Sequence, residues 1–187
     1  VVQKHYLRAR ADIERGAGPD AIEDAIQQIA RAAAILKGSA VADAVLGKPN
    51  LTTGGLSVAA QATLVRPTAL AEDPVSGALW VADANASRVL RFTSAAAFAN
   101  GEAANLVLGQ ADFTSGSCNR GGAVAANTLC GVYGLSVNQA GRLYVSDLVN
   151  NRVLVFHPPF ANGMAASAVL GQANFTSGSP NRGGGAS

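Results

Sequence analysis

Short apolar runs separated by turn-forming residues dominate the second half of the chain. The runs lie at 133–138, 142–146, 151–156 and 167–172. Gly, Asn, Asp and Pro residues occupy the gaps between them. Runs of this length with β-branched and aromatic residues are typical of antiparallel strands joined by tight turns. The pattern therefore predicts a four-stranded antiparallel meander.

The meander occurs twice, because the chain carries an internal repeat. Val-Leu-Gly is found at 45–47, 107–109 and 169–171, a spacing of 62 residues each time. The earlier copy predicts strands at 67–72, 78–82, 87–92 and 105–110. A four-stranded meander repeated at a fixed period is the signature of a β-propeller blade.

The repeats account for residues 39–187. Units cover about 48–110 and 111–172, and a third unit is truncated. Residues 43–47 match an outer strand with no three strands before it. Since propellers usually have about four to eight blades, we expect an incomplete propeller of about two blades plus one extra outer strand. This interpretation makes the chain a fragment of a longer protein, with unpaired blade edges.

Residues 1–38 follow a helical rather than a strand period. One apolar stripe contains Ile22, Ile26, Ile29, Ala33 and Leu36. Pro19 suits a first helical turn and Gly38 a helix end. With a weaker helix over about 2–14, the pattern predicts an N-terminal α-helical hairpin, which belongs to the tail of an upstream domain or serves as a spacer. A partner-binding helix or a coiled-coil stalk is the alternative.

Charge and composition narrow the function classes. The net charge is only +2, and charged residues make up 14% of the chain. So weak a positive balance does not favour binding to nucleic acid or to an anionic membrane surface. No run of about eighteen consecutive apolar residues is present, so the sequence predicts no membrane span.

An Asp, Asn and Arg constellation follows the second strand of each unit. Its members are Asp83, Asn85 and Arg88 in the first unit, and Asp147, Asn150 and Arg152 in the second. An Asp after a strand can accept backbone N–H bonds, and an Arg on the next strand can pair with it. Because the constellation recurs, we expect a structural role in each blade.

Two cysteines lie in the long segment between the units. Cys118 and Cys130 are twelve residues apart, and Pro180 replaces Cys118 in the next copy. Their joint occurrence predicts a disulfide and an oxidising compartment, with two free thiols as the alternative. Only His5 and His157 are histidines, and no Cys-x-x-Cys motif exists. We assign no metal site, cofactor or catalytic residue.

A glycine-rich phrase is repeated almost unchanged in the connectors. It reads VLGQADFTSGSCNRGG at 107–122 and VLGQANFTSGSPNRGG at 169–184. It lacks the helix start and the Lys-Ser/Thr pair of a phosphate-binding loop, which favours a structural connector over a ligand surface. If it binds a ligand, the candidate residues are Phe113, Asn119, Arg120, Phe175, Asn181 and Arg182.

The stretches GLSVNQAGRLYVSDLVNNRVLVF and ALAEDPVSGALWVADANASRVLRF resemble NHL repeats. The likeness covers roughly 66–92 and 131–156, and the bacterial long form of the repeat is the most similar. The first unit departs from the pattern, because Ala69 stands at a Gly position and 73–77 lengthens the first turn. The resemblance implies a β-propeller; that form generally lacks a defined activity, so it informs fold more than function.

These observations predict a non-catalytic NHL-repeat β-propeller module for protein or ligand binding or scaffolding. The expected location is extracytoplasmic or secreted, and the expected partners are a protein or small ligand and the remaining blades. One alternative is part of a propeller enzyme, lyase- or hydrolase-like, whose metal and catalytic residues lie in other blades. Another is the sensor domain of a membrane receptor.

Overall fold

The computed structural model describes residues 42–183 of the chain. Contacts divide the chain into two units, Val1–Asp43 and Ala44–Ser187. The helical hairpin predicted for 1–38 lies outside the described residues. The fold described below is therefore that of the second unit.

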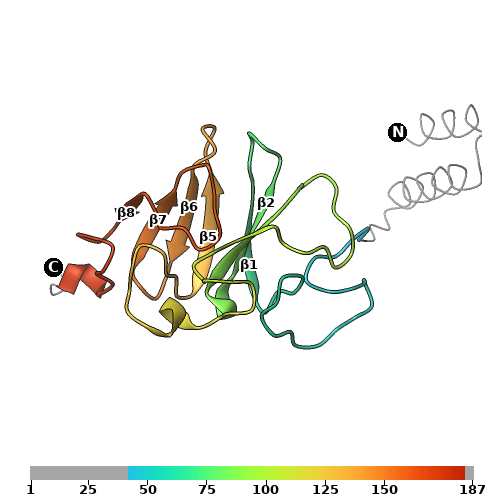
Figure 1. The fold of residues 1–187 in the computed structure, drawn as a ribbon, viewed down its shortest axis with the longest axis horizontal. Helices are drawn as coiled ribbons and strands as arrows, with labels where there is room; N and C mark the ends of the chain where they lie inside the picture. The colour runs from blue at the N-terminus through green and yellow to red at the C-terminus, as the bar shows by residue number, and fades with distance from the viewer. Residues whose placement is uncertain (1–41, 184–187) are drawn as a thin grey trace, which may run out of the picture. The chain divides into compact units, whose positions relative to one another are not determined.

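Two four-stranded antiparallel sheets form the second unit (Figure 1). The first sheet consists of β1 (Pro67–Glu72), β2 (Leu79–Asp83), β3 (Arg88–Phe92) and β4 (Leu106–Leu108). The second consists of β5 (Val132–Val137), β6 (Leu143–Asp147), β7 (Arg152–Phe156) and β8 (Ala168–Leu170). Three 3₁₀ helices lie between or after the strands: η1 (Ala84–Ala86), η2 (Cys118–Gly121) and η3 (Pro180–Gly183). The mainly β expectation and the two four-stranded meanders are confirmed.

The structure assigns no strand to residues 43–47, where the extra outer strand of a further blade is predicted. These residues form bends, and no strand is assigned to them. The outer strands β4 and β8 exist only by pairing with β3 and β7. The third strand that would pair with residues 44–47 is absent from the two described sheets, so the same Val-Leu-Gly sequence stays irregular there.

The hydrophobic core lies between the two sheets. It joins Trp80, Ala82, Val89, Leu106 and Leu108 of the first sheet to Leu143, Val145, Leu154 and Phe156 of the second. Because side chains alternate along a strand, Tyr144 and Ser146 point to the far face of the second sheet, where they are only half-buried. The other face of the first sheet, with Val81 and Leu90, packs against Leu46 and Leu64.

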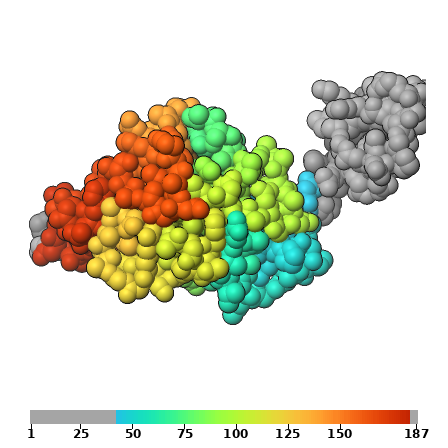
Figure 2. All heavy atoms as spheres, viewed as in Figure 1, coloured from blue at the N-terminus to red at the C-terminus, as the bar shows by residue number. Residues whose placement is uncertain are grey.

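The antiparallel order gives each sheet two different ends. The β1–β2 and β5–β6 turns lie at one end, here called the hairpin end. The β2–β3 and β6–β7 turns lie at the other, together with the connector 109–131; this is the connector end. Figures 1 and 2 show the β1–β2 turn in green beside the β5–β6 turn in orange at the hairpin end.

Candidate functional site

A buried ion pair lies at the connector end of each sheet. Asp83 pairs with Arg88 at 3.0 Å, and Asp147 pairs with Arg152 at 2.8 Å. All four side chains are 0% exposed. Each Asp ends one strand and each Arg begins the next, directly opposite in the ladder. The tight turn between them uses one non-glycine residue with positive φ, Ser87 or Asn151, so the local backbone aligns each pair.

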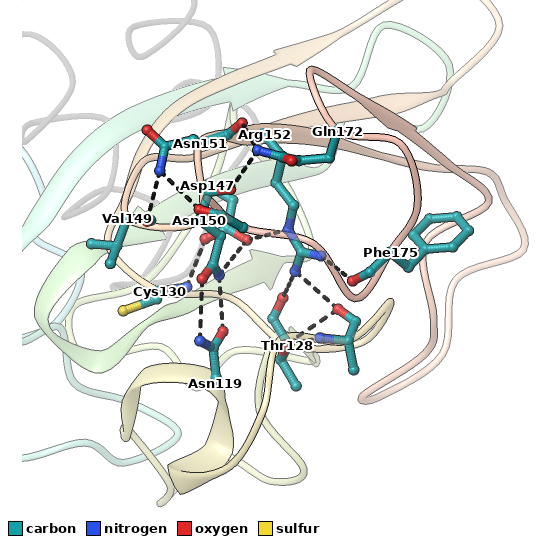
Figure 3. A network of polar contacts seen from close by, with 12 residues as sticks. Asn119, Thr128, Cys130, Asp147, Val149, Asn150, Asn151, Arg152, Gln172 and Phe175 are labelled. Carbon is teal, nitrogen blue, oxygen red and sulfur yellow. Dashed lines mark hydrogen bonds and ion pairs between the residues drawn. The ribbon is translucent and has the colours of Figure 1, made fainter. Parts of the chain in front are cut away.

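Each arginine also binds the carbonyl oxygens of two neighbouring segments, and Figure 3 shows these contacts for Arg152. In the second sheet Arg152 donates to the carbonyls of Ala125 at 2.9 Å, Thr128 at 2.8 Å and Phe175. Arg88 likewise donates to Thr63 at 2.8 Å and to Phe113. Charge-assisted bonds of this kind are stronger than neutral ones. The guanidinium therefore fixes the segment before its sheet and the segment after it.

Both carboxylates also accept backbone N–H groups. Asp83 Oδ1 accepts the backbone N–H groups of Val65 at 3.0 Å and Arg66 at 2.7 Å. Asp147 Oδ1 accepts the N–H of Cys130 at 2.7 Å. Buried ionised groups need an opposite charge and hydrogen bonds of this kind to replace their water. Neither carboxylate is exposed to a solvent-borne ligand.

The two units differ at the asparagine of the constellation. Asn150 is buried and donates to Asp147 Oδ2 at 2.8 Å and to Asn119 at 2.9 Å (Figure 3). Asn85 is exposed, and Ala86 holds the position equivalent to Asn150. Asn85 therefore does not join the ion-pair network of its unit, contrary to the expectation. The shift of one residue turns its side chain to solvent.

A pair of buried glutamines, which sequence reasoning missed, adds a second set of contacts. Gln110 Nε2 donates to the carbonyls of Ser87 at 3.0 Å and Ser117 at 2.8 Å. Gln172 makes the same bonds to Asn151 at 3.0 Å and Ser179 at 2.9 Å. Each glutamine thus joins the turn of its sheet to the following connector. The available signal was the Gln that follows Val-Leu-Gly in both copies of the phrase.

The connectors begin with a turn built on one Asp or Asn side chain. Asp112 Oδ1 accepts the N–H groups of Thr114 and Ser115, each at 2.8 Å. Asn174 accepts from Thr176 at 3.0 Å, and Asn50 forms the same turn. The hydrogen bonds from the Thr114 hydroxyl and from the Ser115 backbone lower the pKa of Asp112 from 3.8 to about 2.

The predicted disulfide between Cys118 and Cys130 is confirmed. It joins η2 to the residue whose N–H binds Asp147. Helix η3 has nearly the same backbone, with φ of 50° at Asn181 against 49° at Asn119, although Pro180 replaces the cysteine. The turn therefore does not need the disulfide, which serves to link the connector to the start of β5.

The candidate connector residues divide into internal and exposed groups. Phe113 and Phe175 pack against the hydrophobic clusters. Asn119 pairs with Asn150, and Arg120 donates to the carbonyls of Gln110 and Gly163, each at 3.0 Å. Their second-copy counterparts, Asn181 and Arg182, are exposed.

Within residues 42–183, no group of three or more His, Cys, Asp or Glu side chains is arranged to hold a metal ion. His157 is half-buried at the end of β7. The same residues contain no helix that is both long and apolar enough to cross a membrane.

We predict that Arg152→Leu lowers the free energy of unfolding by about 3–5 kcal/mol, because it leaves the Asp147 charge buried without a partner. The matched control is Arg142→Leu, at an exposed position of the same sheet, with a change within about 0.5 kcal/mol. Urea denaturation measures both values. Equal effects would show that the buried pair does not hold this end of the sheet together.

We predict that the Asp112 carboxyl titrates near its lowered pKa of about 2 rather than at 3.8. Since the folded pKa is depressed, its stabilising contribution is present above pH 3.8 and is lost as the pH falls towards 2. Asp112→Asn should remove this pH dependence and keep the turn, as Asn50 and Asn174 do. NMR titration of the carboxyl carbon gives the midpoint, and a midpoint near 3.8 contradicts the prediction.

We predict that replacing both Cys118 and Cys130 with serine lowers the free energy of unfolding by about 3 kcal/mol, the value expected for closing a loop of this length. Reductant should destabilise the wild-type chain by a similar amount and leave the double variant unchanged. Denaturation with and without reductant makes the comparison. A wild-type chain insensitive to reductant, although its thiols become accessible to alkylation, would refute the stabilising role.

No protein-family model matches this chain, and no curated protein matches its sequence. The resemblance to NHL repeats therefore depends on the two motif-bearing stretches alone. The geometry adds two matching antiparallel sheets, each with the same buried Asp–Arg pair.

Proposed function

We propose that the chain is part of a non-catalytic NHL-type β-propeller module that acts in binding or as a scaffold, outside the cytoplasm. The observation that carries the proposal is a contact between successive units. It is present at Val45 and Val107, and the equivalent Val169 lacks it among the described residues. Its two parts are an Asn-Gly loop and the Val-Leu-Gly segment that precedes the unit.

The loop after the third strand of each unit binds the Val-Leu-Gly segment that precedes that unit in the sequence. Asn162 Oδ1 accepts the N–H of Val107 at 3.0 Å, and Gly163 N–H donates to the Val107 carbonyl at 2.8 Å. Asn100 and Gly101 bind Val45 in the same way, at 2.9 and 3.2 Å. Each Asn-Gly loop thus binds the backbone N–H and C=O of the valine in the preceding Val-Leu-Gly segment.

The third Val-Leu-Gly segment offers the same groups without a partner loop. Val169 is the counterpart of Val107, and no Asn-Gly loop among the described residues reaches it. Arg120 reaches the Gly163 carbonyl of the next unit, whereas Arg182 is exposed. A further unit of the same type would complete both sets of contacts.

The uncovered sheet face supports the same proposal. In the first sheet Trp80 and Ala82 are completely buried on the face that packs against the second sheet. The equivalent face of the second sheet carries Tyr144 and Ser146, which are half-buried, and Leu170, which is 53% exposed. An additional blade on this face would bury it and extend the core.

Two further observations support the non-catalytic and extracytoplasmic parts of the proposal. The polar side chains that recur between units, such as Arg88 and Arg152, use their hydrogen bonds on the protein's own backbone. Polar side chains whose hydrogen bonds are all made within the protein fit a scaffold better than a reaction centre. The disulfide favours an oxidising compartment, because cytosolic thiols are normally kept reduced.

The test is a chain extended after residue 187 by a second copy of residues 126–187, which continues the repeat in register. The Val169 amide should exchange rapidly with solvent in the present chain and slowly in the extended one, while the Val107 amide stays slow in both. Amide hydrogen exchange followed by NMR measures this.

Arg182→Ala provides the control for the extended chain. It should leave the stability of the present chain unchanged, because Arg182 is exposed there, and should destabilise the extended chain. An appended copy that stays unstructured, with Val169 still unprotected, would overturn the proposal.

A further inference from the structure

A groove of about 320 Å³ lies at the hairpin end, opposite the connectors. Its lining comes from both repeat units and includes Asp73, Val75, Arg91, Pro158, Pro159 and Phe160. The β1–β2 and β5–β6 turns that flank it are the neighbouring green and orange tips in Figure 1. It is formed within residues 73–160, so it does not depend on further repeats.

The side chains at this groove differ between the two repeat units. Arg91 has Val155 as its counterpart in the second unit, and Trp80 has Tyr144. The turn at 73–77 is longer than its counterpart. The fold is built twice, and the second sheet forms without an arginine or a tryptophan at these positions. These residues are therefore not required by the architecture.

Arg91 is a cation held in place without a carboxylate partner. Its guanidinium carbon lies 5.7 Å from the centre of the buried Trp80 ring. Its Nε donates to Asn105 Oδ1 at 2.8 Å, and neither Nη atom donates to any residue in 42–183. The ring and Asn105 orient the guanidinium, and both Nη groups remain available for a carboxylate.

Asp73 supplies a negative charge in the same groove. It is 5% exposed and accepts the Val75 N–H at 2.9 Å and the Ser76 hydroxyl at 2.6 Å. Each oxygen keeps a second lone pair for another donor. Asp73 and Arg91 form no ion pair with each other. Two opposite charges thus remain separate within one small groove.

Apolar surface accounts for the rest of the lining. The Phe160 ring packs edge-on against Trp80, with 4.8 Å between the ring centres. Pro158 and Pro159 are exposed beside it, and Val75 is 68% exposed. Apolar walls with a few oriented polar groups are the usual composition of a small-molecule site.

We propose that this groove binds a small zwitterion with an apolar body, of which an apolar α-amino acid is the simplest case. The carboxylate binds the free Nη groups of Arg91, and the ammonium donates to Asp73. The aliphatic side chain lies against Phe160 and the two prolines. Both charges of such a ligand meet their opposites, and its apolar part leaves water.

The experiment is a fluorescence titration of the chain with L-leucine. Trp80 is the only tryptophan of the protein, so its emission reports on the groove, and leucine itself does not fluoresce. A saturable change with a dissociation constant below about 10 mM is expected. Its absence up to that concentration, by fluorescence and by calorimetry, overturns the proposal.

Arg91→Val tests the cation, because the second sheet folds with a valine at the same position. It should weaken leucine binding at least about tenfold, a loss of 1.4 kcal/mol. Arg66→Gln, at an exposed position of the connector end, should bind leucine as the wild type does. Unchanged binding by Arg91→Val would overturn the proposal.

Two leucine derivatives test the charges without altering the protein. Leucinamide lacks the carboxylate, and N-acetylleucine lacks the ammonium. Each should bind the wild-type chain at least about tenfold more weakly than leucine does. If both bind as tightly as leucine, the groove recognises only an apolar body and the proposal fails.

Discussion

The buried guanidinium of each unit is the group on which the rest of the structure depends. A charge can remain in the interior only if a counter-ion and hydrogen bonds replace its water. Arg152 meets this condition with Asp147 and three carbonyl oxygens from segments on both sides of its sheet. The connectors must therefore keep fixed positions relative to the β6–β7 turn. The contacts of Gln172 reinforce the same constraint.

The comparison of the two units separates structural chemistry from chemistry that the fold does not require. The groups present in both units, such as the Asp–Arg pairs and the Gln contacts, are directed at the backbone of the chain itself. The groups present only once include the disulfide, the buried Asn150 with its bonds to Asp147 and Asn119, and the groove around Arg91. The disulfide links a connector whose turn forms equally well without it. The groove combines unpaired charge with an open apolar wall.

Periodicity predicted most of the fold, because alternation of buried and exposed side chains is a local property of strands. Seven of the eight inner and outer strands were expected at positions that differ by one or two residues at an end, and β1 was expected at its observed bounds. The Cys118–Cys130 disulfide was also predicted, because both cysteines occur in the same connector. No strand is assigned at 43–47, where the outer strand stays a prediction, because an outer strand needs a neighbouring strand to pair with.

The sequence by itself determined the repeat, the antiparallel meanders and the residues that recur in each unit. Those features follow from side-chain pattern and turn chemistry within a few tens of residues. Only the tertiary structure decided that Asn85 points to solvent, that Gln110 is buried against carbonyls, and that Arg91 shares a groove with Phe160 of the loop after β7. These depend on which groups meet across long separations in the chain. Pairing, burial and desolvation are set at that level, so no local pattern encodes them.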